Sequence, residues 1–207
     1  VSNEEVGVVL TEKVGPSIAS DMTTGAVWAV LLSLIAIALY ILLRFRDISF
    51  SVGALASLAF TSFVIIGFYS LFSGILPFSM EIDQSFIAAI LTIIGYAIND
   101  TVVVFDRIRE MIKIYPKEDR FLTFNKALNT TLSRTFMTSF STLLVLLCIF
   151  ILGGDTIRSF TFAMIFGVIV GTFCSLFVAA PIAHAIMKKT LAKKAANAPK
   201  EALQGNR

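Results

Sequence analysis

Charged residues are scarce in this 207-residue chain. They make up 15% of the sequence, where about 25% is usual for a soluble domain, and apolar residues make up 57%. Two cysteines and one histidine provide no metal-ligand spacing and no disulfide framework. No nucleophile, base and orienting group stand at a workable spacing, so an enzyme is not expected. The composition excludes an ordinary soluble domain and points to a membrane protein.

The apolar residues gather in five runs of 18 residues or more, each long enough to cross about 30 Å of hydrocarbon as a helix. They predict an all-α polytopic membrane protein with five transmembrane helices, at about 24–43, 50–72, 85–105, 135–152 and 159–180. Pro181 follows the last span, where a kink or an interfacial extension is expected. The first run follows 23 residues with five charged side chains, so it is interpreted as a mature membrane helix and not as a signal peptide.

The basic residues predict the orientation. Of 17 Lys and Arg residues, 15 fall in the first loop, the third loop and the C-terminal tail, and two fall in the alternate segments. By the positive-inside rule the rich side is cytoplasmic, which places the C-terminus inside. This asymmetry explains the net charge of +3 without a nucleic-acid partner.

Three segments lie outside the predicted spans. Residues 1–23 hold one strand-like run and are too short to form a core, so they are interpreted as the end of an extracytoplasmic domain and its lead-in. In the cytoplasmic segment 107–134, apolar residues at helical spacing favour an amphipathic helix in the headgroup layer over residues 117–133, with a plain connector as the alternative. Residues 188–207 are rich in Ala and Lys and predict a disordered cytoplasmic tail.

Asp100 is the acid that lies well inside a span. A carboxylate near a helix centre costs about 2.5–3.5 kcal/mol on insertion scales, so it should face a protein interior. Burial disfavours its charged form, which would let it exchange a proton near neutral pH. Asn99 is its expected local partner, and Gly95 would let another helix come close. The alternative is a structural hydrogen bond made by a permanently protonated or paired Asp100.

The fourth span begins with a basic and hydroxyl-rich stretch. Arg134 precedes it, and its first two turns carry Thr135, Thr138, Ser139, Ser141 and Thr142. Hydroxyls spaced in this way could hold water or pass protons, while Arg134, which stays charged, would bias or pair with the acid. Alternatively, Arg134 reaches anionic lipid and the hydroxyls bond to their own helix carbonyls.

Small residues predict close helix contacts. Gly167 and Gly171 form a GxxxG pattern in the fifth span, and Gly53, Ala56 and Ala59 line the second. Such patterns indicate a helix bundle and carry no functional information.

The stretch from Gly95 to Glu110, GYAINDTVVVFDRIRE, resembles the signature of SecF and of the SecF half of fused SecDF. These proteins are accessory to the Sec translocon and are related to the RND transporters. Further matches are Val14-Gly15-Pro16, Arg44-Phe45, Arg134-Thr135 with Thr138-Ser139, and Gly153-Gly154, in the family's order over nearly the whole chain.

The resemblance implies a function and a set of residues. It implies a bacterial inner-membrane protein that couples proton flow to the movement of secreted polypeptides out of the translocon. The partners implied are a SecD half or subunit, SecYEG, YidC, the unfolded polypeptide and membrane lipids, with protons as the coupling ion and no other cofactor. Asp100 and Arg134 would form the proton pathway. Supporting polar side chains would be Asn99, Thr101, Thr135, Thr138, Ser139 and Thr142.

The sequence departs from the family in two respects. Many members carry a His-Asp pair in the second span, where this chain has Phe60-Thr61-Ser62 and no ionisable group. Members also have a preceding helix, a periplasmic α+β domain, of which residues 1–23 would be a remnant, and a SecD half. The chain would be the C-terminal part of a six-helix half and is not expected to transport alone. An RND-type small-molecule exporter and a non-conducting structural subunit of the translocon are the alternatives.

Overall fold

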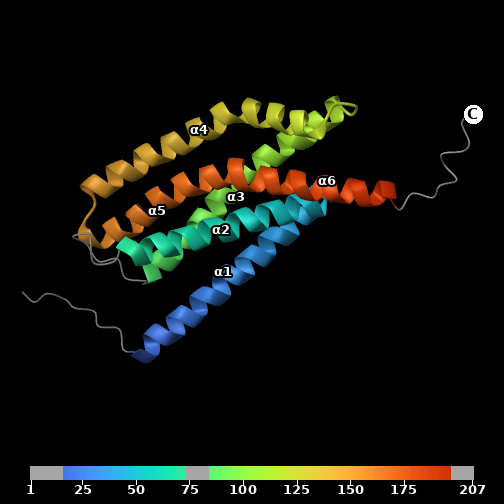
Figure 1. The fold of residues 1–207 in the computed structure, drawn as a ribbon. Helices are drawn as coiled ribbons and strands as arrows, with labels where there is room; N and C mark the ends of the chain where they lie inside the picture. The colour runs from blue at the N-terminus through green and yellow to red at the C-terminus, as the bar shows by residue number, and fades with distance from the viewer. Residues whose placement is uncertain (1–15, 73–83, 197–207) are drawn as a thin grey trace, which may run out of the picture.

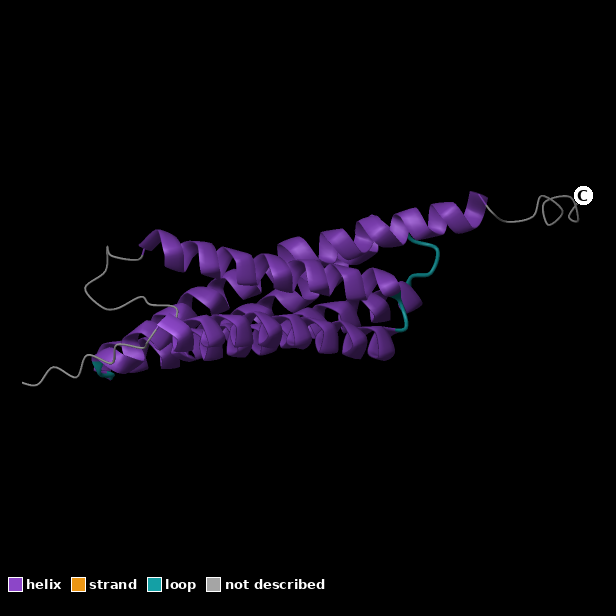
Figure 2. Ribbon diagram, turned by 90° about the horizontal axis from the view of Figure 1, so that it is seen from below, coloured by secondary structure: helices purple, strands orange, loops and turns teal. Residues whose placement is uncertain are grey.

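The computed structural model describes residues 16–72 and 84–196, which are almost entirely helical (Figure 1, Figure 2). The elements in chain order are α1 (Pro16–Phe45), α2 (Ile48–Phe72), α3 (Gln84–Ile114), α4 (Arg120–Leu152), α5 (Asp155–Cys174), a π-helix (Ser175–Ala179) and α6 (Ala180–Ala196). Five helical stretches among these residues are long and apolar enough to cross a membrane, so the predicted five-span all-α fold is confirmed. The strand-like run at 6–11 lies outside the described residues.

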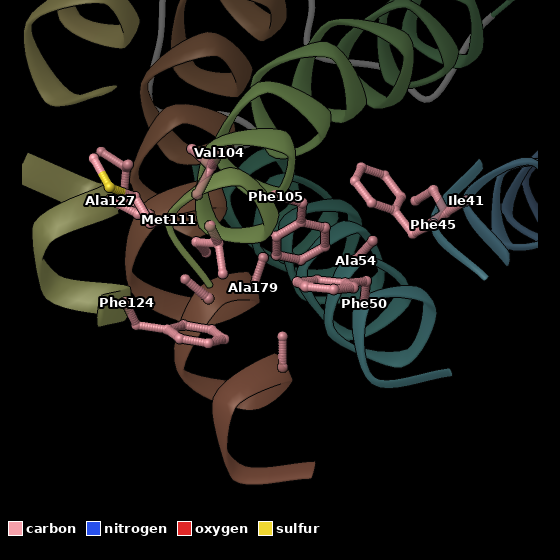
Figure 3. Packing of buried hydrophobic residues seen from close by; sticks show 14 residues of the cluster. Ile41, Phe45, Phe50, Ala54, Val104, Phe105, Met111, Phe124, Ala127 and Ala179 are labelled. Carbon is pink, nitrogen blue, oxygen red and sulfur yellow. The ribbon is translucent and has the colours of Figure 1, made fainter. Parts of the chain in front are cut away.

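The bundle is formed mainly by α2 to α6, and α1 diverges from it (Figure 1). α1 meets α2 at one corner, where Phe45 is buried against Phe50 and Phe105 (Figure 3). The chain reverses through Arg46, whose φ of 54° gives the left-handed conformation that often ends a helix, and Asp47 Oδ1 accepts a hydrogen bond from Ser49 N at 2.8 Å. Most of α1 is exposed, as expected for a helix bordered by lipid or another chain.

The fifth span differs from its prediction in detail. Instead of ending near residue 180, the helix passes through the π-helix and continues to Ala196. The wider turn stands just before Pro181, which cannot donate to a carbonyl one turn earlier and whose ring would clash with the carbonyl of Phe177 in a regular α-helix. The disordered tail predicted for 188–207 is therefore wrong for residues 188–196, whose Ala and Lys residues favour a helix. Residues 197–207 lie outside the described residues.

The amphipathic segment is helical, but it does not form a separate helix. It is the first part of α4, which runs without a Pro or Gly from Arg120 through the fourth span to Leu152. Its apolar side chains Phe124 and Ala127 are buried in the core, against α6. A position in the headgroup layer stays a prediction.

The apolar core is divided into two clusters along the bundle. One lies at the end where α1 meets α2 and includes Phe45, Phe105 and Phe124 (Figure 3). The other, towards the opposite end, includes Leu58, Ile93 and Val168. Buried Ser and Thr residues and Asp100 separate the two clusters.

Glycines allow the helices to approach closely at three of the predicted places. A Cβ at Gly171 would lie 3.1 Å from Ala97 Cβ, and one at Gly167 would overlap the Ile93 side chain, so α5 packs directly on α3. A Cβ at Gly53 would lie 2.7 Å from the Ala179 carbonyl oxygen. Gly95 differs from its prediction, because it is exposed and no neighbouring atom lies within 4 Å of where its Cβ would be.

Gly53→Ala is expected to lower the stability of the full-length protein by about 1–3 kcal/mol, because the added methyl group meets backbone that cannot move aside. Gly67→Ala in the same helix is the matched control, since nothing lies within 4 Å of its Cβ position. Thermal unfolding in detergent measures both. Equal midpoints for the two variants would contradict the close packing of α2 on the π-helix.

Candidate functional site

A layer of polar side chains crosses the bundle between the two apolar clusters. Its members come from α2 to α5 and the π-helix, and all but the half-buried Thr172 are buried: Ser57, Thr61, Asp100, Thr101, Thr135, Ser139, Thr172 and Ser175. We call this set the polar layer. Buried polar groups normally find hydrogen-bond partners, so the exceptions within the layer are informative.

Asp100 is the charged member of the polar layer. It is 6% exposed, and its Oδ2 is buried with no hydrogen-bond partner. Its neighbour Thr101 donates to its own helix, to the Ala97 carbonyl at 2.9 Å. Asn99, the expected local partner of Asp100, is exposed and lies on another face of α3.

The register between α3 and α4 places Thr135 opposite Asp100. The two helices are antiparallel, because Tyr96 Oη donates to Ser139 Oγ at 3.4 Å and Arg107 Nε donates to Thr130 Oγ1 at 3.0 Å. Asp100 follows Tyr96 by four residues in α3, and Thr135 precedes Ser139 by four residues in α4. In antiparallel helices these two steps run in the same direction, so Asp100 and Thr135 lie at the same level. Thr135 is 1% exposed, and its Oγ1 also lacks a partner. Two unpartnered oxygens therefore occupy the same level of the bundle.

A hydrogen-bonded chain leads from α4 to α5. Ser139 Oγ and Thr172 Oγ1 are 2.6 Å apart, and Ser175 Oγ donates to the Thr172 carbonyl at 2.9 Å. With Tyr96 these groups connect three helices. Tyr96, Thr172 and Ser175 were not among the residues predicted from the sequence, although Thr172 and Ser175, two hydroxyls three residues apart before Pro181, were a usable signal.

The second span contributes hydroxyls and no charge to the layer. Thr61 Oγ1 donates to the Ser57 carbonyl at 2.9 Å, and Ser62 Oγ donates to the Leu58 carbonyl at 3.0 Å. Both lie in the stretch where the resemblance to SecF leads one to expect a His-Asp pair. A hydroxyl does not ionise near neutral pH, so neither can replace that pair as a charged group.

Arg134 lies at the edge of a cleft of about 330 Å³ between α3 and α4. The cleft is lined by Val103, Asp106, Arg107, Glu110, Thr130, Thr131 and Arg134. Two neighbouring acids are already paired, Asp106 with Arg44 at 3.0 Å and Glu110 with Arg107 at 2.7 Å. Arg134 is exposed and, in the described part of the chain, makes no ion pair within 4 Å. It stands next to Thr135, which the helix register places level with Asp100.

The hydroxyls of α4 divide between two neighbouring faces. Thr138 is exposed and Thr142 is half-buried, and they donate to the carbonyls of Thr135 and Thr138, each at 3.0 Å. The face directed into the bundle carries Thr135 and Ser139.

The outer face of α3 and α4 is also polar. Its exposed members are Thr92, Gly95, Asn99, Arg134, Thr138 and Ser141. We call this set the outer polar stripe. Polar side chains in a membrane span normally face protein or a water-filled cavity, so this stripe is not expected to face lipid.

Two substitutions test the hydrogen bonding of the polar layer. Ser139→Ala breaks the bond to Thr172 and is expected to cost about 1 kcal/mol of stability. Thr135→Val removes a buried hydroxyl that has no partner, so the free energy of unfolding should stay the same or rise slightly. Thermal unfolding of the full-length protein compares them. A loss for Thr135→Val as large as that for Ser139→Ala would show that the Thr135 hydroxyl is bonded.

Nothing in the described residues suggests a metal centre, because no three His, Cys, Asp or Glu side chains there could hold one ion. The layer offers instead one ionisable group, several hydroxyls and one nearby fixed positive charge. That arrangement can bind and release a proton in a low-dielectric setting.

Comparison with known proteins places these features in a family. Residues 2–189 match the family described as protein export membrane protein SecD/SecF, C-terminal. The protein translocase subunit SecF of Rhodothermus marinus is 47% identical over 187 residues, which is 90% of this chain and 60% of that protein. SecF of Cereibacter sphaeroides is 42% identical over 168 residues, 81% of this chain and 50% of that protein. The chain thus spans little more than half the length of these relatives.

Two solved structures have the same fold. A crystal structure of SecDF in the super-membrane-facing form has a TM-score of 0.75 and 39% identity, over 89% of this chain and 24% of that one. SecDF from Thermus thermophilus, described as a translocon-associated membrane protein, has a TM-score of 0.75 and 41% identity, over 84% and 23%. Since the family match covers most of the sequence and the helices follow those of SecDF, the chain belongs to the SecD/SecF C-terminal family of protein-export membrane proteins.

Proposed function

We propose that this chain is the membrane part of a SecF-type subunit that uses the proton-motive force to assist protein export by the Sec machinery. The relatives named protein translocase subunit SecF support the export role. The observation that carries the proton role is the buried, unpartnered carboxylate of Asp100 in the polar layer. Protons are the coupling ion, and no other cofactor is required.

Asp100 changes the forces between helices when it binds a proton. In its charged form it is attracted by Arg134, which lies at the basic end of the neighbouring helix. Protonation of Asp100 removes that attraction, and α3 and α4 can then shift relative to each other. Asn99, Thr101, Thr135, Thr138, Ser139 and Thr142 are the supporting polar residues, of which Thr135 and Ser139 face the acid's side of the bundle.

The energy available from protons is of the right size. One proton crossing about 100 mV releases about 2.3 kcal/mol, and each pH unit of gradient adds about 1.4 kcal/mol. A nearly complete switch between two conformations needs about 5.5 kcal/mol. At about 100 mV two protons release about 4.6 kcal/mol, and a gradient of one pH unit raises this to about 7.4 kcal/mol. A few protons are therefore enough to drive a conformational change that moves a polypeptide towards release on the periplasmic side.

The outer polar stripe is where we place the SecD half or subunit. SecDF structures contain both halves in one chain, and this chain covers 24% of one of them. A second helical half against α3 and α4 would cover Asn99 and Arg134 and use the open space at Gly95. SecYEG, YidC and the unfolded secretory polypeptide are the further partners that an export role implies.

The orientation of the chain follows from its charges. The C-terminal parts of α1, α3 and α6 point towards the same end of the bundle (Figure 1). They carry the basic residues Arg44, Arg107, Lys113, Lys188 and Lys189. We propose that this end faces the cytoplasm, with the C-terminus inside, in a bacterial inner membrane.

A complementation experiment separates this function from its alternatives. In cells that lack their own full-length protein, restoring it should increase secretion of a signal-peptide reporter, and an uncoupler of the proton-motive force should remove that increase. Drug susceptibility, measured in parallel, should stay unchanged. Unchanged secretion with altered susceptibility would favour an RND-type small-molecule exporter. Restored secretion that the uncoupler does not affect would favour a non-conducting structural subunit.

A further inference from the structure

An apolar groove lies between the start of α4 and α6, away from the polar layer. Its volume is about 150 Å³, and it is lined by Phe121, Phe124, Asn125, Leu128, Ala180, Pro181 and His184. The His184 ring meets the Phe124 ring edge to face, with centroids 5.1 Å apart. Most of the lining is apolar, and Asn125 and His184 supply the polar groups.

Basic residues stand beyond one end of the groove. α4 and α6 run antiparallel here, since Phe124 meets His184 and Leu128 and Ala180 line the groove together. One turn further towards the end of the bundle, this register brings Arg120 of α4 level with Lys188 of α6. Arg120 Nη1 is buried with no hydrogen-bond partner, and Lys188 is exposed.

Two acids precede Arg120 in the chain. Glu118 Oε1 accepts from Lys126 at 2.5 Å while its Oε2 is buried with no partner, and Asp119 is exposed at the start of α4. No ion pair of Arg120 or Lys188 occurs within 4 Å among the described residues. The register thus places two cations without an ion pair of their own one turn beyond the apolar groove, at the basic end of the bundle.

We infer that this groove binds an anionic phospholipid, with the start of one acyl chain in the groove and the phosphate between Arg120 and Lys188. The surface changes from apolar in the groove, through the polar groups of Asn125 and His184, to cationic at Arg120 and Lys188. A phospholipid changes in the same order from its acyl chain to its phosphate. Basic pockets between membrane helices on the cytoplasmic side are typical sites for anionic headgroups. The groove is too small for a whole lipid, so the rest of the lipid lies along the exposed face of α6. The inference rests on the proposed orientation, which puts the basic end of the bundle at the cytoplasmic face, and not on the proton role of Asp100.

Lipid binding to the purified full-length protein tests the inference. Native mass spectrometry with phosphatidylglycerol, phosphatidylcholine and glycerol phosphate separates an anionic lipid from a zwitterionic lipid and from a free phosphate. We expect phosphatidylglycerol to bind in preference to the other two. Equal binding of phosphatidylcholine, or binding of glycerol phosphate as tight as that of phosphatidylglycerol, would overturn the inference.

Variants locate the site. Arg120→Gln with Lys188→Gln should weaken phosphatidylglycerol binding about thirtyfold, since each basic residue near anionic lipid contributes about 1 kcal/mol and 1.4 kcal/mol is a factor of ten. Lys189→Gln with Lys193→Gln removes the same charge from other faces of α6 and should keep the preference. Equal weakening in both pairs would mean diffuse surface charge and would overturn the specific site.

A third variant tests the groove itself and keeps the charges. Leu128 is half-buried in the groove, and Leu128→Trp should fill it and weaken phosphatidylglycerol binding while glycerol phosphate binding stays unchanged. Thermal unfolding without added lipid checks that each variant is folded. Full lipid binding by folded Leu128→Trp protein would contradict an acyl chain in the groove.

Discussion

Asp100→Asn is expected to remove the whole proton-dependent part of export while the protein stays folded and at its normal level. The amide has nearly the shape of the carboxyl group but cannot take up or release a proton. The residue lies 6% exposed in the polar layer, so no solvent-exposed acid can take its place there. Secretion of a reporter, measured with and without an uncoupler, should fall in the variant to the level of the uncoupled wild type.

The same variant separates a functional from a structural role. Asp100 Oδ2 has no hydrogen-bond partner, so Asp100→Asn should change the free energy of unfolding little, whereas breaking a structural hydrogen bond would cost about 1 kcal/mol or more. Asn99→Ala is the matched control on the exposed face of the same helix and should leave proton-dependent export nearly unchanged. A folded, fully active Asp100→Asn protein would refute the proposed role.

Arg134→Gln is expected to have the second largest effect. Arg134 attracts Asp100 when the carboxylate is charged and not when it is protonated. Without the positive charge, proton binding by Asp100 no longer changes the attraction between α3 and α4. A coupling of about 1.4 kcal/mol between the two charges corresponds to a factor of ten, so proton-dependent export should fall about tenfold.

Arg134→Lys keeps the charge and is the informative comparison. Arg134 makes no ion pair in the described part of the chain, so its charge should matter more than its planar geometry. Arg134→Lys should therefore retain most of the activity that Arg134→Gln loses. If the two variants lose equal activity, the role of Arg134 lies in specific hydrogen bonds, such as contacts with the partner half.

The membrane spans could be predicted because a helix of about 20 residues enters a bilayer mainly according to the apolar composition of its own residues. The same rule identified Asp100, since a carboxylate within an apolar run stands out whatever the packing around it. Helix ends were harder to predict. α4 extends back to Arg120 because nothing in residues 120–134 breaks a helix, and packing on α6 buries Phe124 and Ala127.

The inward face of α4 could not be predicted, because Thr135, Thr138, Ser139 and Thr142 share one arc of about 100° and their spacing does not decide which edge of that arc faces the core. Only the contacts of Tyr96 and Thr172 with Ser139 decide which hydroxyls face the core. Asn99 is not a partner of Asp100, because a helix places consecutive residues about 100° apart. Gly95, five residues earlier, lies about 140° round the helix from Asp100 and so also faces away from the bundle core.

Proton flux through the full-length protein in proteoliposomes tests the central claim most directly. The protein is reconstituted with its SecD partner, a membrane potential is imposed, and internal pH is followed with a trapped fluorescent dye. The account predicts potential-driven proton movement in wild-type protein, a normal rate for Asn99→Ala, and no movement above protein-free vesicles for Asp100→Asn. Proton flux through Asp100→Asn equal to that of the wild type would contradict it.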